Sequence, residues 1–189
     1  MSERIRSFIA FDMENEAVLA RLGAVQKQLV ETGADLKMVA PQNIHVTLRF
    51  LGDISPTMVE KVYEAMKQVK FSPFTVQLCG LGVFPSLSYP RVVWVGMTQG
   101  AEQLKSIFSQ LEPQIQSLGF PKDAYGFSPH LTTARVRSGK NKQQLAEFVT
   151  KKANYDFGAI SADCLRLKKS VLSPQGPTYS TLREYCPQK

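Results

Sequence analysis

Segments with the periodicity of strands alternate along this chain with segments of helical periodicity, and this alternation limits the fold more than any other feature. The pattern predicts helices at residues 14–30, 57–69, 101–118 and 142–151, and strands at residues 5–11, 44–51, 74–83, 91–97, 130–136, 157–160, 164–171 and 177–185. Some neighbouring strands are separated only by turn-forming residues, such as those at 84–90 and at 173–176, which is typical of hairpins. Because helices and strands interleave while several connections resemble hairpins, we expect an α+β fold and not a purely parallel sheet.

The order strand, helix, motif strand, helix, strand occurs around His45 and again, more loosely, around His130, 85 residues later. This order is consistent with two related lobes, although the intervening sequences differ too much to establish a duplication. A length of 189 residues is typical of one compact domain with its own core. We therefore expect a single domain over residues 1–189, with one motif in each lobe.

Charge, cysteine content and hydropathy narrow the class of protein further. Lys and Arg outnumber Asp and Glu by 23 to 16, and the net charge of +7 favours an anionic partner such as nucleic acid, although a solvated basic surface gives the same count. Cys79, Cys164 and Cys186 lie far apart and form no C-x-x-C pair, so we expect neither a disulfide nor a zinc site, and a reducing cytoplasm is favoured. No apolar run approaches the roughly 18 residues needed to cross a bilayer, so we expect neither a membrane anchor nor an export signal.

The chain has only two histidines, and both occur in the same sequence context. His45-Val46-Thr47-Leu48 and His130-Leu131-Thr132-Thr133 share the pattern histidine, apolar residue, threonine on two predicted strands. Because side chains alternate along a strand, the histidine and threonine of each copy project from the same face. One such tripeptide is weak evidence, since a lone histidine on a strand is usually structural. Its occurrence at both histidines would be a coincidence if neither had a chemical role.

Displacement at the phosphorus of a phosphodiester requires this combination of groups. A base activates the attacking oxygen, and an acid protonates the leaving oxygen. With an unperturbed pKa of about 6.5, one histidine can be neutral and the other protonated near neutral pH. Threonine hydroxyls can donate hydrogen bonds to the non-bridging phosphate oxygens as charge develops on them. Two such units facing one cleft would make a site for in-line displacement.

Longer stretches around these motifs resemble a known family. The stretches are RSFIAF at residues 6–11, NIHVTLRFLG at 43–52, FSPHLTTAR at 127–135 and GPTY at 176–179. Over essentially its whole length, the chain resembles the two-histidine phosphoesterase superfamily, and within it the RNA 2′,3′-cyclic phosphodiesterases once named 2′-5′ RNA ligases. The resemblance implies a bilobal α+β fold in which two antiparallel sheets line a central cleft and helices lie on the outside, with neither metal nor cofactor.

The resemblance also implies the reaction and the roles of individual residues. A terminal 2′,3′-cyclic phosphate of RNA would be opened to a 2′-phosphate, with His45 as the general acid on the 3′ oxygen and His130 as the general base on water. The same groups run backwards would give weak 2′-5′ RNA joining. Thr47 and Thr132 would hold the phosphate, and Arg135 would add a positive charge. Strict alternation sends Arg135 to the face opposite His130, so this contact requires the strand to bulge or end there.

Four aromatic side chains are candidates for contacts with unpaired RNA bases, with core packing as the alternative for each. One lies within the first motif and three in predicted loops; they are Phe50, Phe84, Tyr89 and Phe127. The expected partner is an RNA with a 2′,3′-cyclic phosphate end, such as a tRNA fragment, bound by a cytoplasmic monomer.

Two other functions stay open from the sequence. The first is a phosphodiesterase for 2′-5′ oligoadenylate or another small cyclic nucleotide, because the motifs report phosphate chemistry and not what is attached to the phosphate. The second, of another class, is a non-catalytic RNA-end binding protein, against which the intact His-x-Thr in both copies argues. The sequence contains no G-x-x-x-x-G-K-[ST], so ATP-dependent ligation is disfavoured.

Overall fold

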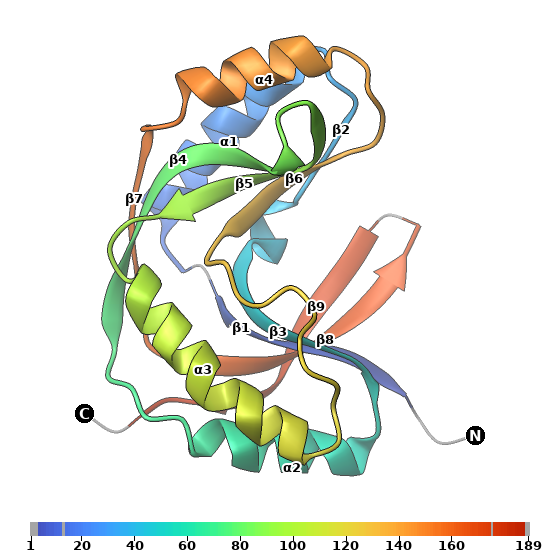
Figure 1. Cartoon of the computed structure of the whole chain (residues 1–189), viewed down its shortest axis with the longest axis vertical. Coiled ribbons are helices and arrows are strands. Elements are labelled where there is room, and N and C mark those ends of the chain that lie inside the picture. The colour runs from blue at the N-terminus through green and yellow to red at the C-terminus, as the bar shows by residue number, and fades with distance from the viewer. Residues whose placement is uncertain (1–3, 13, 175, 188–189) are drawn as a thin grey trace.

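The computed structural model describes residues 4–12, 14–174 and 176–187, and its elements follow the interleaved order expected from the sequence (Figure 1). The helices are α1 (Glu16–Glu31), α2 (Pro56–Lys67), α3 (Ala101–Ser117) and α4 (Lys142–Lys151), with a 3-10 helix, η1, at Pro41–Asn43. The strands are β1 (Ile5–Asp12), β2 (Leu36–Met38), β3 (His45–Ile54), β4 (Phe74–Ser86), β5 (Tyr89–Met97), β6 (Leu131–Val136), β7 (Asp156–Ala162), β8 (Leu165–Ser173) and β9 (Gly176–Tyr185). The short elements β2 and η1 were not predicted, because three residues are too few to show a periodic pattern.

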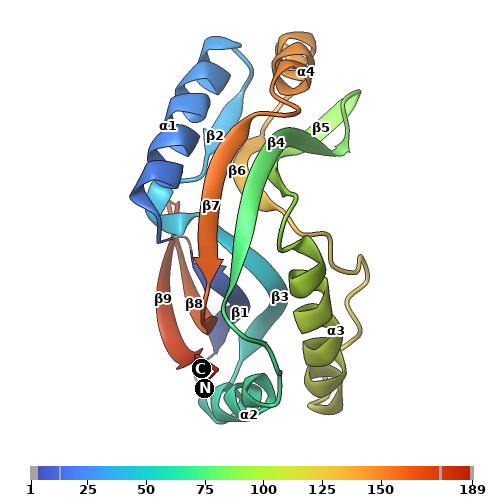
Figure 2. The same ribbon diagram turned by 90° about the vertical axis from the view of Figure 1, so that its left-hand side faces the viewer.

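The strands form two antiparallel sheets, each of which contains one motif strand. The four-stranded sheet has the order β3-β1-β8-β9, and the five-stranded sheet has the order β2-β6-β5-β4-β7. Helices α1 and α4 pack on the five-stranded sheet, whereas α2 and α3 lie together against the four-stranded sheet (Figures 1 and 2). The α+β fold with two antiparallel sheets and outer helices is therefore confirmed.

Local sequence explains where the first two long helices begin. The Asn15 side chain accepts a hydrogen bond from the Val18 amide at 3.1 Å, and the Ser55 hydroxyl accepts one from the Met58 amide at 3.2 Å. Such caps satisfy amides that have no partner in the first helical turn. Pro56 occupies the first position of α2, which suits proline because it lacks the amide that would be unpaired there. None of the helices in the described part of the chain is long and apolar enough to cross a bilayer.

Buried apolar side chains from both sheets belong to one cluster, which includes Leu48 of β3 and Leu131 of β6. Helix α1 contributes Val18, Leu22 and Leu29 to it, at the spacing of one helix face. Full burial of such a side chain stabilises the folded state by about 1.5–3 kcal/mol. The shared core therefore holds the two motif strands in a fixed relation.

Strands β4 and β5 extend farther than predicted. The expected loop at residues 84–90 is a tight hairpin in which only residues 87 and 88 form the turn. Prolines at 85 and 90 suggested a loop, because proline cannot donate to a strand ladder; here they pair with each other beside a bulge. Phe84 and Tyr89 therefore lie on strands and not in a loop.

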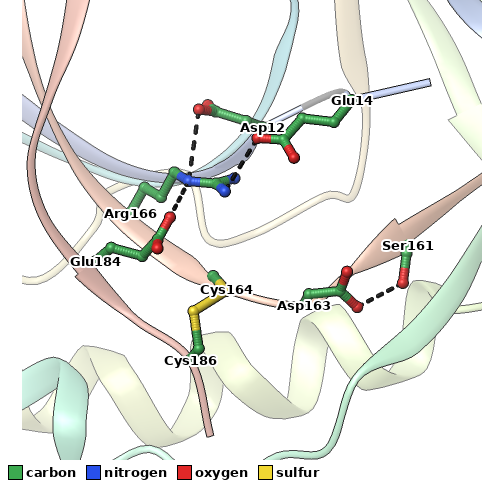
Figure 3. Close-up of a disulfide and its surroundings, with 8 residues drawn as sticks. All are labelled: Asp12, Glu14, Ser161, Asp163, Cys164, Arg166, Glu184 and Cys186. Atoms are coloured by element: carbon green, nitrogen blue, oxygen red, sulfur yellow. Dashed lines mark hydrogen bonds and ion pairs between the residues drawn. A yellow bond between two sulfur atoms is a disulfide. The ribbon is translucent and has the colours of Figure 1, made fainter. Parts of the chain in front are cut away.

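Cys164 and Cys186 form a disulfide, with their Cα atoms 4.3 Å apart, so the expectation of no disulfide was wrong (Figure 3). The antiparallel pairing of β8 and β9 places Leu165 opposite Tyr185, and the two cysteines directly flank this pair. A sequence separation of 22 residues and the unpaired Cys79 concealed the partnership from cysteine spacing alone.

The other end of the β8–β9 hairpin closes where the sequence predicts a turn. Ser173 pairs with Gly176, while Gln175, also part of the predicted turn, lies outside the described residues. The apolar side chains of Val171 and Leu172, in the part of this hairpin next to the turn, are 50% and 63% exposed.

Candidate active site

The second motif strand, β6, carries a β-bulge that decides where Arg135 points. In its pairing with β5 the register shifts, and Thr133 is left without a cross-strand partner. Thr132 pairs with Trp94, and Arg135 pairs with Val92. Trp94 and Val92 are two residues apart and share one face of β5, so their partners share it as well. The bulge therefore brings Arg135 onto the face of Thr132, which the phosphate-binding hypothesis required.

The first motif strand, β3, has an equivalent bulge. In its pairing with β1 the register skips Leu48, which stands three residues after His45. Strand β1 keeps its alternation, and its residues 8, 10 and 12 pair with Phe50, Thr47 and His45. These three side chains of β3 consequently share one face. Phe50 thus occupies the position in the first motif that Arg135 has in the second.

Each histidine ring is held in the same way by the backbone that precedes it. Nδ1 of His45 lies 2.8 Å from the carbonyl oxygen of Asn43. Nδ1 of His130 lies 2.7 Å from the carbonyl oxygen of Ser128. A carbonyl oxygen only accepts hydrogen bonds, so each Nδ1 carries the hydrogen. In the neutral form of such a ring Nε2 is unprotonated, and this is the atom that can take a proton and later give it.

His45 lies among aromatic rings of the four-stranded sheet. Its ring stacks on Phe8 with 4.7 Å between centroids, and Tyr179 meets it edge-on at 5.1 Å. Burial lowers the pKa of His45 to about 4, although the hydrogen bond to Asn43 and the charge of Asp12 act in the opposite direction. The imidazole is therefore neutral at pH 7 in this structure.

A cavity of about 140 Å³ lies beside His45. Asp12 and Lys168 form an ion pair at 2.6 Å in its wall, and Lys168 is only 9% exposed. Glu14 and Tyr179 also line the cavity. The volume is sufficient for a few water molecules next to the imidazole.

His130 is supported by aromatic side chains of the five-stranded sheet. Phe84 meets its ring edge-on at 5.0 Å, and the Trp94 ring lies 5.1 Å from Phe84. The structure thus places Phe84, a candidate for base contact, directly against the second histidine.

The side chains assigned to the phosphate have no hydrogen-bond or ion-pair partner among the residues that the structure describes. Thr47 and Thr132 are half-buried, Arg135 is exposed, and in the described ranges none of the three side chains forms a hydrogen bond or an ion pair. By contrast, Arg49 and Arg166 bind carboxylates. These hydrogen-bond donors lie on the motif strands near the two histidines, so they are available to an anionic ligand.

Tyr179 links the two motifs. Its ring contacts the His45 ring, and its hydroxyl interacts electrostatically with Arg135 of the five-stranded sheet. Burial raises the pKa of Tyr179, while Arg135 and Arg6 act to lower it. An arginine of the second motif is therefore close to the aromatic cluster that holds the first histidine.

The remaining aromatic candidates differ in their surroundings. Phe50 is 62% exposed, on the face of the first motif. Tyr89 is 57% exposed, with the Arg91 guanidinium 4.6 Å from its ring centre. Phe127 stacks on Phe108 of α3 at 5.2 Å, which favours packing over contact with RNA.

Sequence reasoning did not assign Phe8, Tyr179 or the Asp12–Lys168 pair to the site. Phe8 and Tyr179 stand within the stretches that carry the family resemblance, which was the one signal for them. Lys168 reaches the site only because β8 pairs with β1, a relation that periodicity does not reveal.

The part of the chain that the structure describes contains one group of potential metal ligands, Cys164, Glu184 and Cys186. Its two sulfur atoms are bonded to each other, so they are not available as thiolate ligands. Neither histidine belongs to such a group among these residues.

The fold and the paired motifs define a class of protein. Two antiparallel sheets, each with a His-x-Thr strand bulged at the same position, are the arrangement of a two-histidine phosphoesterase. The model of a family described as LigT like Phosphoesterase matches residues 13–94 and, separately, residues 95–179, so each match contains one motif. The chain belongs to this LigT-like phosphoesterase family.

Individual relatives match over nearly the whole chain. An RNA 2′,3′-cyclic phosphodiesterase of Aeropyrum pernix is 35% identical over 88% of this chain and 95% of its own length. One of Archaeoglobus fulgidus is 33% identical over 96% of this chain and 99% of its own. The crystal structure of Escherichia coli LigT complexed with 3′-AMP is similar with a TM-score of 0.78 at 22% identity, covering 100% of both chains, and shows that the fold is shared.

Proposed function

We propose that this protein hydrolyses the terminal 2′,3′-cyclic phosphate of an RNA to a 2′-phosphate, with two imidazoles as acid and base and without a metal ion. The observation that carries the proposal is the pair of bulged strands, each of which has a histidine at its first position or directly before it, with Nδ1 held by a backbone carbonyl, and a threonine hydroxyl that has no partner among the described residues. The relatives named RNA 2′,3′-cyclic phosphodiesterase support this substrate.

In the proposed reaction, Nε2 of His130 takes a proton from a water molecule, which attacks the phosphorus. The bond from phosphorus to the 3′ oxygen breaks, and Nε2 of His45 gives a proton to that oxygen. Thr47, Thr132 and Arg135 donate hydrogen bonds to the non-bridging oxygens, where negative charge grows in the transition state. With the 5′-hydroxyl of a second RNA in place of water, the same transfers would form a bond from phosphorus to the 5′ oxygen, break the bond to the 3′ oxygen and so join the two RNA ends through a 2′-5′ linkage.

The acid role of His45 requires that it gain a proton before the reaction. Burial lowers its pKa to about 4, so the ring is neutral at pH 7 before substrate binds. An anionic phosphate beside the ring favours the imidazolium form and raises this pKa. We therefore expect substrate binding to be accompanied by proton uptake at His45.

The test uses a short RNA that ends in a 2′,3′-cyclic phosphate, in the presence of EDTA, with the wild type, His45→Ala and His130→Ala. We expect the wild type to form a 2′-phosphate and each variant to lose activity by on the order of 10²–10⁴-fold while remaining folded. Loss of wild-type activity in EDTA would contradict the metal-free mechanism, and a 3′-phosphate product would contradict the direction of opening.

Two outcomes would favour the alternative functions. Faster turnover of 2′-5′ oligoadenylate or a small cyclic nucleotide would favour the second enzyme hypothesis. RNA that binds but forms no product would favour a non-catalytic RNA-end binding protein.

A substrate with sulfur in place of the 3′ bridging oxygen assigns the acid. A thiolate leaves without prior protonation, so His45→Ala should recover most of its lost activity on this substrate. His130→Ala should recover none, because water must still be activated. The opposite pattern would exchange the two roles.

We also propose that residues 1–189 act as one monomeric domain in the cytoplasm, on RNA such as tRNA fragments. The shared core supports a single unit, and size-exclusion chromatography with light scattering tests the monomer. Disulfides are rare in a reducing cytoplasm, so the state of Cys164 and Cys186 in the cell tests this location. Alkylation of free thiols in freshly lysed cells, followed by mass spectrometry, would show whether this bond exists there.

A further inference from the structure

We propose that Arg6 and Tyr179, which lie next to Arg135, form a subsite for the phosphodiester that precedes the terminal nucleotide of the RNA. A mononucleoside 2′,3′-cyclic phosphate has no such phosphodiester, so the protein should prefer oligonucleotides. This inference rests on the proposed function and specifies its substrate class.

Arg6 lies on the same face of β1 as the ring that stacks on His45. Strand β1 alternates regularly along its pairing with β8, and Arg6 precedes Phe8 by two residues. Ser7, between them, is 1% exposed, whereas Arg6 is exposed. Arg6 therefore projects beside the stack of Phe8 and His45.

The pairing of β1, β8 and β9 brings Arg6 towards Tyr179. Ser7 pairs with Lys169, and the same register continued by one residue places Arg6 beside Ser170. Ser170 pairs with Tyr179. Cross-strand partners share a face, so Arg6 and Tyr179 project from the same side of the four-stranded sheet.

Two arginines from different sheets act on the Tyr179 hydroxyl. The charges of Arg135 and Arg6 both lower the pKa of this phenol, and burial, the larger effect, raises it. The hydroxyl is therefore protonated at neutral pH and can donate a hydrogen bond.

These donors have no acceptor in the described part of the chain. Among the described residues, neither guanidinium of Arg6 and Arg135 nor the hydroxyl of Tyr179 forms a hydrogen bond or an ion pair. Asp53 is the register partner of Arg6 on β3 but makes no ion pair with it there. Arg166 of the same sheet, in contrast, is surrounded by carboxylates (Figure 3). With Arg135 assigned to the reacting phosphate, the Arg6 guanidinium and the Tyr179 hydroxyl are donors that match the acceptor oxygens of the next phosphodiester.

This cluster lies beside the reacting groups. The Tyr179 ring is 5.1 Å from the His45 ring, and Arg135 belongs to the face that holds the second motif. Positive charge therefore continues from Arg135, proposed to bind the reacting phosphate, past Tyr179 to Arg6. An RNA backbone that leaves the reaction centre along this path would place its next phosphate at Arg6.

The experiment compares three substrates: adenosine 2′,3′-cyclic phosphate, the dinucleotide ApA with a 2′,3′-cyclic phosphate end, and the same dinucleotide with a neutral methylphosphonate linkage. We expect the wild type to have a kcat/KM about tenfold or more higher for the charged dinucleotide than for the mononucleotide, because a charge-assisted hydrogen bond to phosphate contributes this much. The methylphosphonate should remove most of this advantage.

Arg6→Gln should lower kcat/KM for the charged dinucleotide about tenfold to a hundredfold more than for the mononucleotide. In this variant, kcat/KM for the methylphosphonate dinucleotide should differ less from kcat/KM for the charged dinucleotide, because the charge that the methylphosphonate lacks would no longer have an arginine to bind. Tyr179→Phe, which keeps the ring against His45, should reduce the preference for the dinucleotide by a smaller factor. Arg183→Gln is the matched control, since it removes the same charge from β9, where Arg183 pairs with Glu60, and should keep the wild-type preference.

Equal losses on mononucleotide and dinucleotide in Arg6→Gln, or a wild type indifferent to the methylphosphonate, would overturn the subsite and leave the proposed function intact. Absence of wild-type turnover on all three substrates would overturn the proposed function and the subsite with it.

Discussion

Nδ1 of His130 lies 2.7 Å from the carbonyl oxygen of Ser128, and the same contact joins His45 to Asn43 in the first half of the chain. In each half, the carbonyl of the residue two positions before the histidine fixes the tautomer of the imidazole. A β-bulge three positions after the histidine then places the residue five positions after it on the same face of the strand as the threonine. The two halves thus share one backbone arrangement. They differ in what it presents, because the fifth residue is Phe50 in one half and Arg135 in the other.

The burial of His45 should make stability depend on pH. Its pKa falls from 6.5 in the unfolded chain to about 4 in the fold, so the stabilising contribution is complete above pH 6.5 and is lost as the pH falls through about 4. The two pKa values correspond to at most about 3 kcal/mol. Urea unfolding at pH 7 and pH 4 should show the wild type losing up to this much more stability than His45→Gln. Parallel pH dependence of the two proteins would contradict a buried neutral imidazole.

Arg135 should matter for catalysis and not for folding, because it has no partner in the described part of the chain. Arg135→Met removes a donor aimed at the phosphate, and we expect kcat/KM to fall about a hundredfold. The melting temperature should stay close to that of the wild type. Arg137→Met, which removes an exposed charge two residues further on, should have a much smaller effect. A large drop in melting temperature for Arg135→Met with little change in kcat/KM would refute this role.

Arg49 joins the two motif segments through a buried ion pair. Its Nε lies 2.7 Å from Oε2 of Glu112 in α3, and its guanidinium also donates to the carbonyl of Pro121, in the segment that leads to His130. Arg49 and Glu112 are each only 7% exposed. Arg49→Met would leave the Glu112 carboxylate buried without its main partner, at a cost of about 3–5 kcal/mol in the free energy of unfolding.

A double variant separates lost charge pairing from lost packing at this position. Arg49→Met combined with Glu112→Met leaves neither charge unpaired and should be more stable than Arg49→Met alone. Urea unfolding of both proteins measures the difference. Equal stability of the single and the double variant would attribute the loss to packing.

Periodicity predicted the elements well where each is defined by its own sequence. Helix α4 was predicted with the bounds that are observed, Lys142–Lys151, because polar loops flank a regular amphipathic pattern. The bulges at Leu48 and Thr133 could not be predicted, since a bulge is a property of a strand and its partner together. The same applies to the disulfide, because Cys164 and Cys186 meet only through the pairing of β8 with β9.

The residues of the candidate site also fall into two groups, those that the sequence indicated and those that only the fold revealed. His45, His130 and their threonines were found because each pair lies within three residues of sequence. Phe8 and Arg6 lie on β1 and Tyr179 lies on β9, all far from His45 in the chain, and only the order β3-β1-β8-β9 brings these strands together. Short-range motifs therefore indicated the residues proposed as acid, base and phosphate ligands, whereas the residues that surround them could be identified only from the fold.

The Cys164–Cys186 disulfide should stabilise the fold mainly by restricting the unfolded chain. Cross-linking residues 22 positions apart corresponds to about 3 kcal/mol of lost loop entropy in that chain. The double variant Cys164→Ser and Cys186→Ser should lose about this much free energy of unfolding, whereas Cys79→Ser, at the free cysteine, should lose less.

The disulfide joins the ends of β8 and β9 that lie farthest from the hairpin turn. Tyr179 is held independently of it, by its pairing with Ser170 and its contacts with Phe8 and His45. We therefore expect kcat/KM of the folded double variant to stay within about twofold of the wild type, as for a change remote from the reacting groups. Activity on the cyclic phosphate, measured well below the melting temperature with and without a thiol reductant, checks this. Loss of activity on reduction while the protein stays folded would instead show that the disulfide positions Tyr179 against His45.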